Sequence, residues 1–291
     1  MIYKLTGICG LIGFQGFLGW WMVKSGLKDD LFAPGSHPRV SQYRLAAHLG
    51  TAFVAYGAML LSGLSILYEH TMLKDPKAAL SLLEKLSLPH TRRFRIAVTA
   101  LTALVFTTVI SGALVAGLDA GLIYNEFPWM GLNLAPPKAE LLDPRYSRQA
   151  DQSDLWWRNM LENPSLVQLD HRILAMTTFT AVVSLFLMPR FSSKLKAALS
   201  GKANKGLTAV MHTASLQVVL GISTLIYMVP TWLAAAHQAG ALALLTTVLM
   251  LGSRLRVPPR TIRLLQESVR KQASSPASLK RTGGTVQQIV K

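Results

Sequence analysis

Residues Ile96 to Gly117 read IAVTALTALVFTTVISGALVAG, a stretch without a charged side chain. A helix that spans a membrane needs about 20 mostly apolar residues, so this stretch predicts one. Five others qualify, and the six predicted spans run at residues 3–23, 45–67, 96–117, 169–189, 207–229 and 232–252. We therefore expect an all-α fold, a polytopic membrane helical bundle with six transmembrane helices.

The composition supports a membrane protein and excludes several other classes. Of the 291 residues, 51% are hydrophobic and only 15% are charged, whereas a soluble domain has about 25% charged residues. A disordered basic chain has low hydrophobicity, the reverse of this pattern. The basic residues that give the net charge of +16 lie in the segments between apolar stretches, so no nucleic-acid partner is expected. The single cysteine, Cys9, excludes a disulfide framework and a cysteine-rich metal site.

The charged residues alternate in sign along the connecting segments. Lys and Arg outnumber Asp and Glu in 68–95, 190–206 and 253–291, and the reverse holds in 119–168. The positive-inside rule therefore predicts both termini on the cytoplasmic or matrix side, so the positive charge mainly reports topology. We expect 68–95 to be a basic loop on that side and 253–291 to be a mobile basic tail.

Three histidines lie inside apolar stretches: His48, His171 and His237. Each falls a few residues into its predicted helix, about 6–9 Å below the surface, and all three helices start on the same side. An ionisable group inside a membrane is costly and marks a candidate functional site. A lone buried histidine is more often a hydrogen-bonded structural residue, but three at one depth indicate ligation. The other histidines, His37, His70, His90 and His212, are interpreted as loop or interfacial residues.

Haem iron fits these histidines better than zinc or copper does. Zinc favours cysteine or carboxylate ligands beside histidine, and copper favours methionine or cysteine ligands. Haem iron needs one axial histidine per face and small residues that let the macrocycle approach, and alanine and glycine flank His48 and His237. Ordinary close helix packing explains the same small residues. Arg44 and Arg172 are candidate partners of haem propionates, with snorkelling to the headgroups as the alternative.

A short internal repeat connects the two ends of the membrane region. Gln15-Gly-Phe-Leu-Gly19 resembles Gln217-Val-Val-Leu-Gly221, and the next predicted span in each case carries His48 or His237. The third and fourth spans have no counterpart before the first. We therefore interpret the six helices as the remnant of a 4+4 pseudo-repeat, in which the first hairpin of the N-terminal half is missing.

Seven motifs extend this pattern over most of the chain. They are Gly19-Trp-Trp-Met-Val-Lys-Ser-Gly26, Arg39-Val-Ser-Gln-Tyr-Arg-Leu-Ala-Ala-His-Leu-Gly50, Gly112-Ala-Leu-Val-Ala-Gly-Leu-Asp-Ala-Gly121, Asn125-Glu-Phe-Pro-Trp-Met-Gly131, Glu162-Asn-Pro164, Gln168-Leu-Asp-His-Arg-Ile-Leu174 and Pro230-Thr-Trp-Leu-Ala-Ala-Ala-His-Gln238. In kind and order they resemble the heme A synthase family, specifically its mitochondrial branch.

The resemblance implies a function and a set of site residues. It implies an oxidoreductase that oxidises a ring methyl of haem O to a formyl, giving haem A for cytochrome c oxidase. His171 and His237 would be the iron ligands of a bis-His haem B, with Arg172 as a further cofactor-binding residue. A bis-His haem has no open coordination position, so it relays electrons. His48 would be the catalytic residue and iron ligand on the haem O side.

The resemblance also implies a division of the chain. Residues 1–67 would be the remnant of the N-terminal half with His48, 68–95 the basic loop, 96–252 the four-helix haem-binding half and 253–291 the basic tail. In the family the partner of His48 lies on a helix with a Glu-x-x-x-His pattern, which does not occur in this sequence. An incomplete gene model, a fragment and a split form with a separate second chain all agree with this, and we expect poor turnover from this chain alone.

The expected location is the mitochondrial inner membrane, or the plasma membrane of a prokaryote. Expected partners are membrane lipids, a ferredoxin-type electron donor, haem O synthase and further copies of the chain. Two other functions remain open at this stage. A bis-His b-type cytochrome that only transfers electrons needs His171 and His237 alone, and a non-catalytic oxidase-assembly subunit needs the histidines only as structural residues.

Overall fold

The computed structural model describes residues 2–27 and 39–273. Six of its helices are long and apolar enough to cross a membrane, which confirms the predicted fold class. These are α1 (Ile2–Ser25), α2 (Gln42–Lys74), α4 (Pro89–Gly117), α7 (Pro164–Phe191), α9 (Gly201–Ile226) and α10 (Thr231–Arg254). The shorter elements are α3 (Pro76–Ser87), η2 (Ala120–Leu122), α5 (Lys138–Leu141), η3 (Pro144–Tyr146), α6 (Leu155–Glu162), α8 (Ser193–Ala198) and α11 (Pro259–Ala273).

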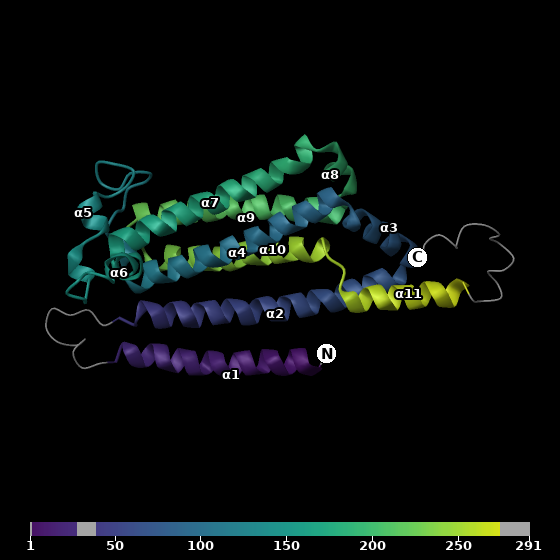
Figure 1. Cartoon of the computed structure of the whole chain (residues 1–291), viewed down its shortest axis with the longest axis horizontal. Coiled ribbons are helices and arrows are strands. Elements are labelled where there is room, and N and C mark those ends of the chain that lie inside the picture. The colour runs from purple at the N-terminus through teal and green to yellow at the C-terminus, as the bar shows by residue number, and fades with distance from the viewer. Residues whose placement is uncertain (1, 28–38, 274–291) are drawn as a thin grey trace.

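Four of the long helices form a bundle with a square cross-section. Around the square, α4 packs against α7, α7 against α9, α9 against α10, and α10 against α4. Helices α7 and α10 therefore occupy opposite corners. Helix α2 lies against α4 and α10, and α1 packs against α2 at the edge of the molecule (Figure 1).

Helix α2 approaches the four-helix bundle closely near its first residue. A Cβ atom placed on Gly117 of α4 would lie 2.6 Å from the Cα atom of Gln42. Real side chains do not come that close, so the two helices touch backbone to backbone here. The same end of α2 is tied to α6, because the Tyr43 hydroxyl donates a hydrogen bond of 2.9 Å to Glu162.

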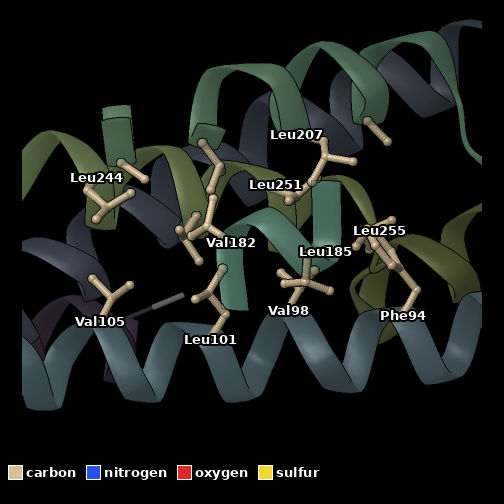
Figure 2. Packing of buried hydrophobic residues seen from close by; sticks show 14 of the residues in the cluster. Phe94, Val98, Leu101, Val105, Val182, Leu185, Leu207, Leu244, Leu251 and Leu255 are labelled. Atoms are coloured by element: carbon tan, nitrogen blue, oxygen red, sulfur yellow. The ribbon is translucent and has the colours of Figure 1, made fainter. Parts of the chain in front are cut away.

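The main apolar core fills one half of the four-helix bundle. It comprises side chains from α4, α7, α9 and α10, among them Phe94, Val98, Leu101, Val105, Val182, Leu185, Leu207, Leu244, Leu251 and Leu255 (Figure 2). A second cluster, of Leu118, Ala120 and Val167, lies towards the other end. The three candidate histidines belong to the level between these clusters. Burying large aliphatic side chains contributes about 1.5–3 kcal/mol each, so the core fixes the helices on either side of that level.

Short elements cover the two ends of the bundle. The segment between α4 and α7, with α5 and α6, covers one end, and α3, α8 and α11 lie at the other (Figure 1). The basic segments lie at the α3 end, as the charge pattern predicts. The start of α1 is also at that end (Figure 1).

Two basic segments differ from the loop and the mobile tail that the sequence predicted. Residues 68–95 continue α2, form α3 and begin α4, because Asp75 caps Ala78 and prolines open α3 and α4. In the tail, α11 covers Pro259–Ala273, and its fully buried Leu265 packs with Met72 and Ala79. An amphipathic helix that buries one face in this way keeps its basic face in water. Residues 274–291 lie outside the described part of the chain.

Candidate functional site

His171 and His237 lie on the opposite helices α7 and α10, at the same level of the four-helix bundle. His171 is about two turns into α7 and His237 nearly two turns into α10. Both imidazoles are half-buried. The described members of the main core end about two turns away, at Val105, Ala214 and Leu244. The structure therefore places at one level the two histidines that the family resemblance assigns to one cofactor.

A hydroxyl group on α4 orients the ring of His171. The oxygen of Ser111 lies 2.7 Å from Nδ1 of His171 and also donates a hydrogen bond of 2.8 Å to the carbonyl of Thr108. A hydroxyl has one proton, and that of Ser111 is used in the bond to Thr108. The Ser111 oxygen therefore accepts a hydrogen bond from Nδ1–H of His171. Nε2 of His171 then carries the free lone pair. The sequence analysis missed Ser111, although a serine within an apolar span that also carries Gly112 was a usable signal.

The backbone of His237 is held by a glutamine on α9. Nε2 of Gln217 donates a hydrogen bond of 3.1 Å to the carbonyl of His237. The amide fits because residue 240 is glycine, where a Cβ would lie 2.2 Å from Oε1 of Gln217. Nδ1 of His237 and Oε1 of Gln217 are buried without a hydrogen-bond partner among the described residues. A buried unpaired ring nitrogen is unusual and fits a residue that binds a ligand.

His48 has the same construction in the other helix pair. Nε2 of Gln15 donates a hydrogen bond of 2.9 Å to the carbonyl of His48 and lies 3.4 Å from its Nε2. Nδ1 of His48 is buried without a hydrogen-bond partner in the described residues, like that of His237. The Gln15–His48 and Gln217–His237 pairs therefore repeat one contact, which the short sequence repeat had indicated. His48 lies between α1 and α2, apart from the four-helix bundle.

The two arginines considered for haem propionates hold backbone carbonyls in this structure. The guanidinium of Arg172 donates hydrogen bonds of 2.9 to 3.0 Å to the carbonyls of Tyr124, Glu126 and Trp129. Its Nε is buried without a partner among the described residues. Arg44 donates a hydrogen bond of 2.8 Å to the carbonyl of Trp21 and lies over the ring of that residue.

Arg172 belongs to a group of side chains that hold residues 121–130 at one end of the bundle. Gln168, one turn before it, donates a hydrogen bond of 2.9 Å to the carbonyl of Tyr124. The amide of Asn125 donates to the carbonyls of Gly121 and of Leu225 in α9. The segment is thereby tied to both α7 and α9 at the end nearest His171.

The rest of the α4–α7 connection is organised by buried polar groups. The fully buried amide of Asn159 accepts from the backbone N–H of Asp143 and donates to the carbonyls of Asp143 and Leu155. Asp154 accepts from Ser147, from Arg158 and from a backbone N–H. These bonds make the acidic segment a folded cap over this end of the bundle.

The remaining histidines take no part in the site. His70 and His212 are exposed, and His90 lies in the first turn of α4. His37 falls outside the described residues. Within residues 2–27 and 39–273, no three side chains of His, Cys, Asp or Glu gather as a metal site would need. The histidine pair is therefore the donor set to consider, and a pair of histidines suits a haem iron, which takes its other four ligands from the porphyrin.

Comparison with known proteins finds a matching family and similar curated proteins. Residues 1–249 match the COX15-CtaA family, described as cytochrome oxidase assembly protein. The chain is 48% identical over 279 residues to a heme A synthase-mitochondrial ferredoxin fusion protein of Schizosaccharomyces pombe, covering 94% of this chain and 45% of that protein. It is 49% identical over 261 residues to heme A synthase COX15 of Saccharomyces cerevisiae, covering 89% and 53%.

The human protein named heme A synthase COX15 is 44% identical over 259 residues, covering 88% of this chain and 56% of its own length. The chain thus spans about half the length of these curated relatives. No solved structure matched it. Because the family match covers most of the chain and includes all three span histidines, this multi-pass membrane protein belongs to the COX15-CtaA family of cytochrome oxidase assembly proteins.

Proposed function

We propose that the chain carries out the reaction of a heme A synthase, in which a ring methyl of haem O is oxidised to the formyl of haem A. The observation that carries this proposal is the placement of His171 and His237 at one level on opposite corners of the four-helix bundle. The similar proteins from fission yeast, budding yeast and human, all named heme A synthase, support it.

The resident cofactor in this proposal is haem B, held between His171 and His237. The fit rests on the donor set, on the unpaired Nδ1 of His237 and on the proton at Nδ1 of His171, which leaves Nε2 of that ring for iron. When bound by these two histidines, haem B would supply one-electron transfer. The residues of this chain supply position and surroundings.

Each of those residues has a defined task. Ser111 accepts a hydrogen bond from Nδ1–H of His171, and this bond fixes the tautomer and the plane of the ring. Gln217 holds the backbone of His237 in place. Arg172 holds residues 124–129 at the end of the bundle nearest His171.

His48 is the proposed catalytic residue, facing the haem O substrate. Support comes from a repeated contact: Gln15 donates a hydrogen bond to the carbonyl of His48, as Gln217 does to the carbonyl of His237. Arg172 remains a proposed propionate partner, since its buried Nε has a free proton. A charge-assisted hydrogen bond from that nitrogen to a carboxylate is compatible with its bonds to the loop carbonyls.

The proposed location is the mitochondrial inner membrane, with both termini of this chain on the matrix side. The mitochondrial relatives and the basic end of the bundle support this. A ferredoxin-type protein is the proposed electron donor, since the fission yeast relative is a fusion with a mitochondrial ferredoxin. The basic end attracts an acidic protein, and anionic lipids compete for the same charges. Haem O synthase and further copies of the chain are also proposed partners.

A haem analysis of the purified chain tests the cofactor. The full chain is purified in detergent, and its haem is identified by the pyridine haemochrome and by mass. We expect haem B in the wild type and its loss in His171→Ala and His237→Ala. His70→Ala is the control, because that histidine is exposed at the opposite end. A wild type without haem, or two variants that retain it fully, would overturn the proposal.

A second experiment separates the enzyme from an electron-transfer cytochrome. Haem O, a reduced ferredoxin and oxygen are supplied to the haem-loaded chain, and haem A is sought by mass. Formation of haem A that His48→Ala abolishes, with haem B retained, supports the synthase. Haem B that is reduced and reoxidised without haem A, also when the sequences that extend the relatives are co-expressed, would support the b-type cytochrome instead.

A further inference from the structure

A glycine lies directly against each of the three span histidines. A Cβ atom built on Gly19 would lie 3.0 Å from Cε1 of His48. The corresponding distances are 3.1 Å from Gly112 to Cε1 of His171 and 3.0 Å from Gly221 to Cε1 of His237. Each glycine is on the helix that precedes the histidine in its pair: α1 for α2, α4 for α7 and α9 for α10.

The orientation of the ring is also the same in the three pairs. In each case Cε1 is the nearest atom, and the two ring nitrogens follow at 3.6 to 3.8 Å from the built Cβ. The edge of the imidazole between its two nitrogens therefore faces the glycine almost symmetrically. With that edge fixed, Nδ1 and Nε2 lie on either side of the contact.

This contact is specific to three positions and does not reflect a general wealth of glycine. In α1 a Cβ on Gly7, Gly10, Gly13 or Gly16 would meet nothing within 4 Å, and the same holds for Gly63 of α2. Other close glycines meet different groups, such as the Gln42 backbone at Gly117. Among the described glycines, a histidine is the nearest neighbour only at Gly19, Gly112 and Gly221.

A side chain at these positions must displace the ring. Carbon atoms in contact prefer separations of about 3.5–4.0 Å, so a methyl group at about 3 Å pushes the imidazole away or turns it. The histidine backbone cannot easily follow, because Gln15 and Gln217 hold the carbonyls of His48 and His237. The ring of His171 cannot turn without breaking its hydrogen bond to Ser111.

We infer that Gly19, Gly112 and Gly221 are positioning residues that set the rotation of the three imidazole rings, and thereby the direction in which each presents its metal-binding nitrogen. For Gly112 and Gly221 this inference rests on the proposed haem B between His171 and His237. The orientation of an axial ligand tunes the iron that it binds. Glycine suits these positions because a Cβ atom would stand about 3 Å from the ring and force it to shift.

The test compares glycine-to-alanine variants of the full, haem-loaded chain. Gly112→Ala and Gly221→Ala carry a methyl group against the ring, and Gly16→Ala and Gly63→Ala are matched controls in open space. The readouts are haem content, the electron paramagnetic resonance spectrum of the ferric haem and its midpoint potential. We expect altered g values and potential in the first two variants, with haem affinity lower by about 10–100-fold, and wild-type values in the controls.

A double-mutant cycle keeps the inference testable if an alanine variant retains no haem. Gly221→Ala is made in the wild type and in His237→Ala, and thermal unfolding of the haem-free proteins is compared. With the ring removed, the methyl group meets no imidazole, so the loss of stability caused by Gly221→Ala should disappear. An equal loss in both backgrounds contradicts the inference.

The possible failures are distinguishable. A wild type that binds no haem refutes the proposed cofactor. The double-mutant cycle still reports whether the glycine contact positions the imidazole ring. A wild type that binds haem, together with Gly112→Ala and Gly221→Ala variants that have its spectrum and potential, overturns the positioning role alone.

Discussion

The Ser111 oxygen lies 2.7 Å from Nδ1 of His171 while its proton is directed at the Thr108 carbonyl. This pairing fixes one tautomer of the ring and leaves Nε2 as the only metal-binding atom. His237 and His48 have no such partner for Nδ1 among the described residues. The two histidines that would hold the proposed haem therefore differ in their hydrogen bonding, and His171 would be the stronger electron donor to the iron because its Nδ1–H is hydrogen-bonded.

Ser111→Ala should weaken that donation. We expect haem affinity to fall by about 10–100-fold and the midpoint potential of the remaining haem to rise, because a poorer donor stabilises the ferric state less. A redox titration of the purified chain measures the potential. Ser65→Ala is the control, since the Ser65 hydroxyl only donates to the carbonyl of Ser62. An unchanged potential in Ser111→Ala would show that the hydroxyl has no electronic role.

Arg172 is predicted to hold residues 124–129 by geometry as well as by charge. In Arg172→Lys the charge remains, but one ammonium group cannot reach the carbonyls of Tyr124, Glu126 and Trp129 together. Hydrogen–deuterium exchange in 124–130 should therefore rise in Arg172→Lys and to the same extent in Arg172→Gln. Arg190→Lys serves as the control. Wild-type exchange in the lysine variant would mean that positive charge alone holds the segment.

Asn159→Leu should destabilise the cap between α4 and α7. The substitution leaves the Asp143 N–H and carbonyl without their buried partner, and such losses amount to about 3 kcal/mol in total. Exchange of the amides in 143–163 should become much faster, whereas Asn204→Leu at an exposed site of α9 should have little effect. Equal exchange in both variants would contradict the central role of Asn159.

The cap should open in acid because of Asp154. Burial alone would raise the pKa of this carboxyl, but hydrogen bonds from Ser147, Arg158 and the Arg148 N–H outweigh it and hold the pKa well below its ordinary value of 3.8. The ionised group therefore stabilises the cap above about pH 4, and this contribution is lost as the pH falls through the lower folded pKa.

Hydrogen exchange of 143–158 as a function of pH measures this loss, after correction for the intrinsic exchange rate. Asp154→Asn should show less dependence on pH below 4, and exposed Glu84→Gln should retain the wild-type profile. Identical profiles for the wild type and Asp154→Asn would refute the assignment.

An alkaline counterpart is predicted at Tyr124. Burial, together with the 2.8 Å hydrogen bond that its hydroxyl donates to Glu140, raises the pKa of Tyr124 to about 12. The neutral phenol thus stabilises the fold fully below pH 10, and this is lost as the pH rises through 12. The difference in tyrosinate absorbance between the wild type and Tyr124→Phe should have its midpoint near 12; a midpoint near 10 would be incompatible with this environment.

The parts of the structure that sequence predicts best are those that one helix determines alone. Apolar length sets the six spans, and the distance from the start of a helix sets the depth of His48, His171 and His237. The Gln15 and Gln217 motifs were visible for the same reason. Ser111 and the three glycines were missed because their role arises only where two helices meet.

Charge was a poorer guide to local structure than to topology. The basic residues of 68–95 and 259–273 suggested solvated segments, whereas both are largely helical because apolar side chains such as Leu86 and Leu265 bury one face. Arg172 looked like a partner for a ligand or for headgroups, and the carbonyls that it binds come from a segment more than 40 residues earlier in the chain. No sequence pattern indicates such a pairing.

The contact between Gly117 and Gln42 sets how closely the start of α2 approaches α4. His48 lies about 9 Å further along α2, so a side chain at position 117 would wedge the start of the helix outwards and swing His48 relative to the four-helix bundle. Electron tunnelling weakens steeply with distance. A side chain at position 117 would therefore lengthen the path of electrons in the proposed reaction, between the His171–His237 pair and His48, although Gly117 touches none of these histidines.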